Sequence, residues 1–221
     1  MTLDDRIFHP TTPRAIDPAR LTIVTDAAAE PWTVSDAEVG YHLRRDSSDD
    51  DAYVTHLIKA ARRQFERMTG LALVNQTLKA TWDRLPSRNG ATLTEVDLPR
   101  APLSSISSVK YLNSTGAEQT FSASAYSAKD VACVGAFGRL ALKPDYDWPE
   151  LGDYKGAFYV TFVSGFGASA ASIPEDIRLA ILWMVAWWYE ERLPVNVGNI
   201  VNPLPAHLTD MIEGHRVAFI A

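Results

Sequence analysis

One stretch near the C-terminal end, Ile177 to Tyr189, constrains the fold more than any other part of the chain. Only one residue within it is charged, and eleven successive uncharged residues end at Tyr189. Pro174 suits the first turn of a helix, and the two acidic residues after it suit the positive end of the helix dipole. Pro194 would stop the helix. The sequence therefore predicts a helix over 174–192 that is apolar around its whole circumference.

A helix without a polar face must be covered on every side or lie in a membrane. Eleven residues of helix span roughly 16 Å, against about 30 Å of bilayer hydrocarbon, so a membrane span is not expected. Two arrangements remain open. The helix is either the central core helix of a monomer, or it packs on its own chain and on another subunit. In the second case Trp183, Trp187 and Trp188 are candidate interface residues.

Three further helices are expected, over 33–45, 50–69 and 205–213. The helix over 50–69 has the clearest pattern, because its apolar residues fall within one stripe of the helical wheel and Gly70 suits the C′ position. Its acidic residues lie at the start and its arginines, Arg62, Arg63 and Arg67, towards the end, which favours the macrodipole. For the first helix, either Thr33 with Asp36 or Ser35 with Glu38 makes a capping pattern, and the sequence does not choose between them.

Between the second and third helices the period of apolar residues changes from 3.6 to 2. Residues 73–163 contain several alternating runs, such as Leu78, Ala80 and Trp82, separated by turn residues. This pattern predicts a β-rich, mostly antiparallel insertion. The expected fold class is α+β, a helical bundle of about four helices with this insertion between the second and third.

The two ends of the chain differ from this central part. Residues 1–31 contain four prolines and are interpreted as an extended, partly mobile arm, in which 21–24 could add an edge strand. Residues 32–221 are expected to form a single domain. After Pro194 an apolar segment is broken by prolines and a glycine, so it cannot be a regular helix and is expected to lie against a surface. Its candidate interface residues are Val195, Val197, Ile200, Val201 and Leu204.

Composition excludes several classes of protein. The net charge of −6 argues against tight, sequence-independent DNA binding, which would need a basic surface. The single cysteine, Cys133, rules out an intramolecular disulfide and a Cys-rich metal site, and fits a reducing cytoplasm. The start of the chain lacks the pattern of a signal peptide.

No catalytic, cofactor or metal signature is found. The five histidines lack metal-binding spacing. Ser164 lacks the glycine two positions earlier that a nucleophile elbow needs. Gly165 and Gly167 are interpreted as a turn between a strand and the last long helix. We expect no enzyme activity, no cofactor and no metal.

Taken together, three groups of segments resemble one known family, the head–tail connector (adaptor) proteins of long-tailed bacteriophages and of phage-derived gene transfer agents. The resemblance runs from about Leu21 to the C-terminus and departs from the family in the longer N-terminal arm, residues 1–20. The segments that carry it are Glu30–Glu38 with His42–Arg44 and Ala60–Gly70, Leu98–Leu103 with Ser108–Leu112, and Phe162–Gly167 with Ile173–Ile177 and Trp187–Arg192.

The resemblance implies a structural protein that forms a ring of about twelve copies beneath the portal protein. The ring would extend the DNA channel and present a platform to the next head-completion (stopper) or tail protein. Double-stranded DNA would pass through without sequence-specific binding, which suits an acidic chain. The expected location is the head–tail junction of a virion, assembled in the bacterial cytoplasm. Alternatives are another head-completion or tail-terminator protein of the same virion or, less favoured, a small hydrolase.

Burial of the helix over 174–192 leads us to expect one residue to be sensitive to charge. Trp187→Asp should abolish soluble folding or ring assembly, because it places an unpaired charge in apolar surroundings.

Overall fold

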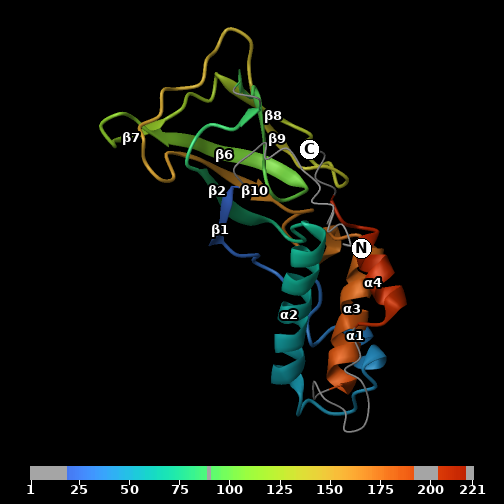
Figure 1. The fold of residues 1–221 in the computed structure, drawn as a ribbon. Helices are drawn as coiled ribbons and strands as arrows, with labels where there is room; N and C mark the ends of the chain where they lie inside the picture. The colour runs from blue at the N-terminus through green and yellow to red at the C-terminus, as the bar shows by residue number, and fades with distance from the viewer. Residues whose placement is uncertain (1–18, 89–90, 192–203, 218–221) are drawn as a thin grey trace, which may run out of the picture.

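The computed structural model describes residues 19–88, 91–191 and 204–217. In these residues four α-helices gather at one end of the molecule, and ten strands extend away from them (Figure 1). All the strand ladders are antiparallel. The α+β class, with antiparallel strands between the second and third helices, is confirmed.

Helix α2 (Asp51–Thr69) follows the apolar periodicity of its sequence closely. The residues that face the core recur at helical spacing and include Val54, Ile58 and Phe65. The helix ends where Gly70 adopts a left-handed conformation with φ of 78°, which costs a glycine little.

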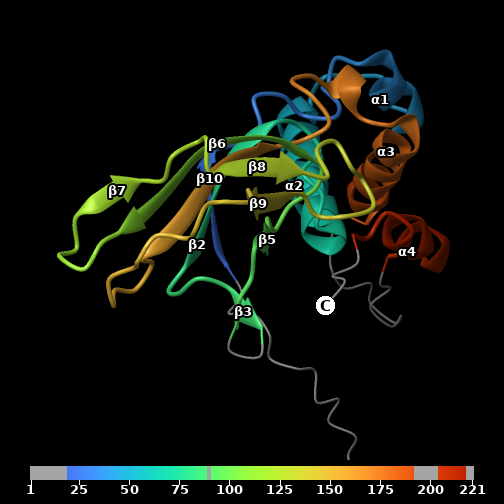
Figure 2. The ribbon, with the colours of Figure 1, turned by 90° about the horizontal axis from the view of Figure 1, so that it is seen from above.

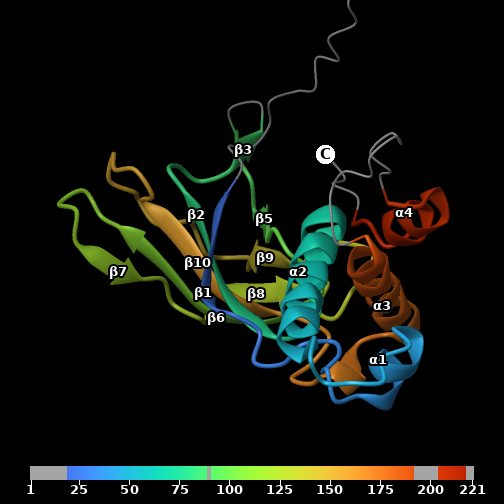
Figure 3. The same ribbon diagram turned by 90° about the horizontal axis from the view of Figure 1, so that it is seen from below.

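Helix α3 (Glu175–Glu190) runs antiparallel to α2, since the Tyr189 hydroxyl near its end donates to Asp50 at the start of α2 over 2.8 Å. Seen from below, α2 lies between the sheets and α3, while α1 and α4 (Ala206–Glu213) lie on the far side of α3 (Figure 3). A buried apolar core fills the space between these four helices.

Helix α1 (Ala37–His42) is shorter than the span 33–45 expected from the sequence. Asp36 accepts a hydrogen bond from the backbone N–H of Thr33 over 2.7 Å, and the Asp36 N–H donates to the Thr33 carbonyl over 3.1 Å. The Thr33–Asp36 pair therefore forms the turn that precedes the helix. Because residues 33–36 form this turn, the helix begins only after them.

The larger sheet has the order β1-β2-β10-β6-β7. In β2 alternate residues are buried, as the period of 2 predicts, and β10 pairs with both β2 and β6. Strand β1 pairs with β2 and confirms the edge strand expected near Leu21. The five strands are β1 (Arg20–Thr25), β2 (Gln76–Trp82), β6 (Leu103–Leu112), β7 (Glu118–Thr120) and β10 (Phe158–Ser164).

A second, three-stranded sheet packs against one face of the first (Figure 2). It contains β5 (Glu95–Asp97), β9 (Arg139–Leu142) and β8 (Tyr126–Lys129), and a hairpin of β3 (Ser87–Arg88) and β4 (Ala91–Thr92) lies beside it. Side chains such as Val96 and Leu140 meet Leu78 and Val160 in an apolar core separate from that of the helices.

The expected arm is only partly described, since residues 1–18 lie outside the described residues. Residues 20–31 do not form a free arm. Residues 20–25 are a strand of the larger sheet, and Asp26 and Glu30 form ion pairs with α2. The proline content of this region suggested an extended chain, but the partners that fasten it are distant in sequence and could not be read from it.

Candidate subunit interface

Helix α3 divides into a buried side and an uncovered side. Ile177, Ala180, Ile181, Met184 and Val185 are each at most 2% exposed and pack in the helical core. Their spacing places them on the side of α3 that faces α2 and α4. The apolar character of this side is therefore explained by folding of the chain itself.

The other side carries an apolar stripe that the described part of the chain leaves partly uncovered. Leu179 is 40% exposed, Trp183, Ala186 and Trp187 are half-buried, and Glu190 is exposed. Successive turns of the helix contribute them, at positions 179, 183, 186 with 187, and 190, so they lie along one side of the helix. We call these five residues the α3 stripe. The described residues therefore do not enclose helix α3 on every side.

A groove of about 360 Å³ runs along the C-terminal part of this stripe, from Trp183 to Glu190. Trp183 meets the ring of His207 edge-on, with 5.7 Å between ring centroids. The groove is open and mainly apolar, and its lining side chains come from α1, α3 and the start of α4. They are His42, Trp183, Ala186, Trp187, Glu190, Pro205, His207 and Leu208.

Three of the interface candidates also pack on their own chain. Trp183, Trp188 and Leu204 are half-buried and contact the helical core. Val195, Val197, Ile200 and Val201 lie outside the described residues. An interface role for Trp183 and Trp187 fits their half-buried position in the groove and stays a prediction.

The start of α3 is held in place by the segment before α1. The indole N–H of Trp32 donates to the Arg178 carbonyl over 2.7 Å, and the Arg178 guanidinium lies 3.9 Å from the Trp32 ring centroid. Trp32 is 6% exposed. This combined hydrogen bond and cation–π contact fixes the orientation of the α3 stripe relative to the rest of the bundle.

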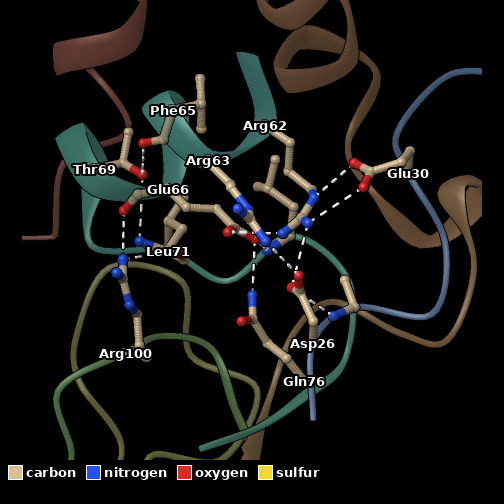
Figure 4. A network of polar contacts seen from close by, with 12 residues as sticks. Asp26, Glu30, Arg62, Arg63, Phe65, Glu66, Thr69, Leu71, Gln76 and Arg100 are labelled. Carbon is tan, nitrogen blue, oxygen red and sulfur yellow. Dashed lines mark hydrogen bonds and ion pairs between the residues drawn. The ribbon is translucent and has the colours of Figure 1, made fainter. Parts of the chain in front are cut away.

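A buried ion-pair network joins the bundle to the larger sheet (Figure 4). Arg62 of α2 is 1% exposed, and its guanidinium donates to three carboxylates. The distances are 2.7 Å to Glu30, 3.0 Å to Glu66 and 3.3 Å to Asp26. Burial by itself would lower the pKa of Arg62, but the hydrogen bond to Glu30 and the surrounding carboxylates outweigh it and raise that pKa. The guanidinium therefore stays charged.

Glu66 extends the network towards the sheet. It accepts hydrogen bonds from the Leu73 N–H over 3.0 Å and from the side chain of Gln76, at the start of β2, over 2.9 Å. Arg100 donates to the Glu66 and Leu71 carbonyls. Burial raises the pKa of Glu66, opposed by the Leu73 N–H and by both guanidinium groups. Sequence reasoning missed this network, because Arg62 and Glu66 resemble ordinary surface residues of a charged helix.

The residues considered for chemistry do not come together. The Ser164 hydroxyl is fully buried and donates to the Arg100 carbonyl over 3.2 Å. Gly165 and Gly167 lie in the connection between β10 and α3, where Gly165 donates to the Pro102 carbonyl and Gly167 accepts from the Asn75 N–H. Within the described ranges, no three His, Cys, Asp or Glu side chains could hold a metal ion. In the same ranges, no helix is both long and apolar enough to cross a membrane.

The sequence matches the family model described as head completion protein over residues 33–218. A comparison with curated protein sequences finds no match. Among solved structures, a chain in the neck of an empty gene transfer agent particle, computed with C6 symmetry, superposes with a TM-score of 0.72 at 22% identity. Chains in a native gene transfer agent virion and in a native neck computed with C12 symmetry give 0.67 at 21% identity. Each alignment covers 91% of this chain and 97% of the other, so the chains share a fold.

Proposed function

The chain belongs to the head completion protein family, and from that membership we propose that it is a structural head–tail connector subunit. In this role it acts at the junction between the head and the tail of a phage or phage-like particle. It forms a ring beneath the portal protein, extends the DNA channel and presents a platform to the stopper or tail protein.

The observation that carries the proposal is the α3 stripe. Two tryptophans and a leucine at helical spacing stay partly uncovered by the described residues. Contiguous exposed apolar surface of this kind marks a protein–protein contact. A heterologous contact that closes into a ring covers one such face on every copy.

The shared fold supports the ring and its position. The similar chains come from necks computed with C6 and C12 symmetry, and we propose about twelve copies here. Duplex DNA passes through the ring without sequence-specific contacts. The net charge of −6 suits such a channel, because a strongly basic lining would bind phosphates and slow passage.

The Trp187→Asp variant tests the proposal. Trp187 is half-buried and lines the groove, so the variant should remain folded, with a far-UV circular dichroism spectrum like that of the wild type. It should fail to form rings, because a charge would be enclosed in the apolar contact. Ring formation is scored by electron microscopy of the protein alone and of portal-bearing heads to which it is added.

Tyr146→Asp is the matched control. Tyr146 is an aromatic residue that is 44% exposed, in the loop after β9 and away from the groove. This variant should assemble like the wild type. A wild-type protein that stays monomeric and never joins portal-bearing heads contradicts the proposed function, as does normal assembly of Trp187→Asp.

A further inference from the structure

We propose that the contact between neighbouring copies in the ring pairs the outer face of α2 on one copy with the α3 stripe and the adjoining edge of α4 on the next. This inference rests on the proposed ring and identifies the two surfaces that would build it. The occupant of the uncovered groove is thus a second copy of this chain.

The outer face of α2 is a continuous exposed stripe. At 100° per residue its members fall within one arc of the helical wheel, opposite Val54, Ile58 and Phe65. Three of its seven side chains are small, three are lysine or arginine, and none is acidic. The residues of this α2 outer face are Ala52, Thr55, His56, Lys59, Ala60, Arg63 and Arg67.

The α2 outer face and the α3 stripe lie on opposite sides of the bundle. Seen from below, α2 is next to the sheets, α3 follows, and α1 and α4 flank the far side of α3 (Figure 3). The groove lies between α1, α3 and α4. A heterologous contact joins two different faces. When these faces lie on opposite sides of a subunit, the contact can repeat from copy to copy and close into a ring.

The two faces carry opposite charge. Lys59, Arg63 and Arg67 make the α2 outer face basic. Arg63 forms an ion pair with Asp26 of its own chain, over 2.8 Å, and its side chain remains 56% exposed. On the other side, Asp210 and Glu213 are exposed on α4 and Glu190 is exposed at the end of α3. Charge complementarity of this kind selects a partner and fixes its register.

Internal contacts place these groups at matching levels along the bundle. The bond from Tyr189 to Asp50 puts the end of α3 beside the start of α2. The pair of His215 with Asp176, at 3.2 Å, puts the chain just after α4 beside the start of α3. Along the axis of the bundle, Glu190 therefore lies beside the first turn of α2. The tryptophans lie beside its middle, and the acidic residues of α4 lie nearer its C-terminal end.

If the symmetry axis of the ring runs parallel to the helices, neighbouring copies are not shifted along it. Residues at the same height in the two copies then face each other. The small residues of α2 then face the tryptophans, which lets the two helices approach to about 8–10 Å. Lys59 lies near the level of Trp183, where an ammonium can rest on an indole face. Arg67, higher on α2, lies at the level of Asp210 and Glu213. Apolar burial supplies most of the association energy, and the charges fix the register.

Charge reversal tests the pairing with two double variants. The α2 variant, Lys59→Glu with Arg67→Glu, carries acidic charge on both faces. The α4 variant, Asp210→Lys with Glu213→Lys, carries basic charge on both faces. Under conditions in which the wild type forms rings, each variant alone should lose at least ten-fold in ring yield, because every contact would join like charges.

An equimolar mixture of the two variants should restore the rings. In an alternating ring the acidic α2 of one variant meets the basic α4 of the other, and the basic α2 of the second meets the acidic α4 of the first. Native mass spectrometry should then show both variants in equal number within each ring. Such complementation cannot arise if the variants are merely misfolded.

Arg84→Glu with Lys143→Glu is the control for the α2 variant, since it makes the same change in charge at exposed positions in the sheet region. It should assemble alone. The pairing is wrong if either helix variant assembles as well as the wild type, or if the mixture stays unassembled. Absence of wild-type rings, alone and on portal-bearing heads, would instead contradict the proposed function, so the two failures are distinguishable.

Discussion

Three arginines of α2 that look alike in the sequence have different roles in the folded chain. Arg62 is enclosed by Asp26, Glu30 and Glu66, while Arg63 and Arg67 are exposed. The helix macrodipole explains why basic residues are favoured near the C-terminal end of α2. It does not explain why the Arg62 guanidinium is only 1% exposed. Arg62 is buried because the segment before α1 brings two carboxylates over it.

Removing this guanidinium should be far more costly than removing its neighbour. Arg62→Ala leaves a buried carboxylate of Glu66 without its cation, and we expect a loss of about 3–5 kcal/mol in the free energy of unfolding. Arg63→Ala removes an exposed partner of the same Asp26, and should cost less than about 1 kcal/mol. Urea denaturation of both variants measures the difference, and equal losses would contradict the structural role given to Arg62.

At the scale of the element, α3 has an apolar surface on nearly every side, but its two sides lie in different environments. Its Ile181 side is packed against the helices of its own chain, and its Leu179 side remains partly uncovered. The two sides are chemically similar, so hydrophobic periodicity cannot distinguish them. The helix is apolar all round because both sides are covered, one by folding and the other, as we propose, by assembly.

Truncation on one side should therefore affect mainly stability, and truncation on the other mainly assembly. Ile181→Ala should lower the free energy of unfolding by about 2–5 kcal/mol, because it leaves a cavity in a packed core. Leu179→Ala should cost under about 1 kcal/mol in the isolated chain but reduce ring yield. Chemical denaturation and electron microscopy of each variant separate the two effects. A larger loss of stability for Leu179→Ala than for Ile181→Ala would reverse the assignment of the two sides.

At the scale of the whole molecule, two apolar cores are joined by polar contacts. One core lies among the helices and the other between the sheets. The Arg62 network spans the junction, together with backbone hydrogen bonds such as that from Ala72 to the Ala101 carbonyl over 2.7 Å. A single domain over 32–221 remains a prediction, and it requires that these contacts couple the two cores.

A truncation in the sheet core tests the coupling. Leu78→Ala removes a side chain that is 1% exposed and should cost about 2–5 kcal/mol. If the chain unfolds as one cooperative unit, hydrogen exchange of the slowest amides in α3 should accelerate to the same extent as in β10. Thr77→Ala, a half-buried position on the other face of β2, is the control. Unchanged protection of α3 in Leu78→Ala would show two independent domains.

Much of the fold follows from local signals. The helix over 51–69, the alternating strands β2 and β10 and the turn at Gly165 were predictable, because periodicity and turn residues act over a few positions. The bounds of α1 and the burial of Arg62 were not. They depend on Thr33 pairing with Asp36 and on carboxylates more than 30 positions away from Arg62.

By itself the sequence determined that a helix apolar on every side had to be covered, since transfer of apolar side chains from water is favourable wherever they lie. Only the tertiary structure decided which side of it the chain covers and which it leaves open. That choice depends on where α2 and α4 pack, and their placement is set by contacts between residues far apart in the sequence. The same contacts place the basic face of α2 opposite the α3 stripe. The periodicity within each helix could not predict this, because it does not show how two helices are oriented relative to each other.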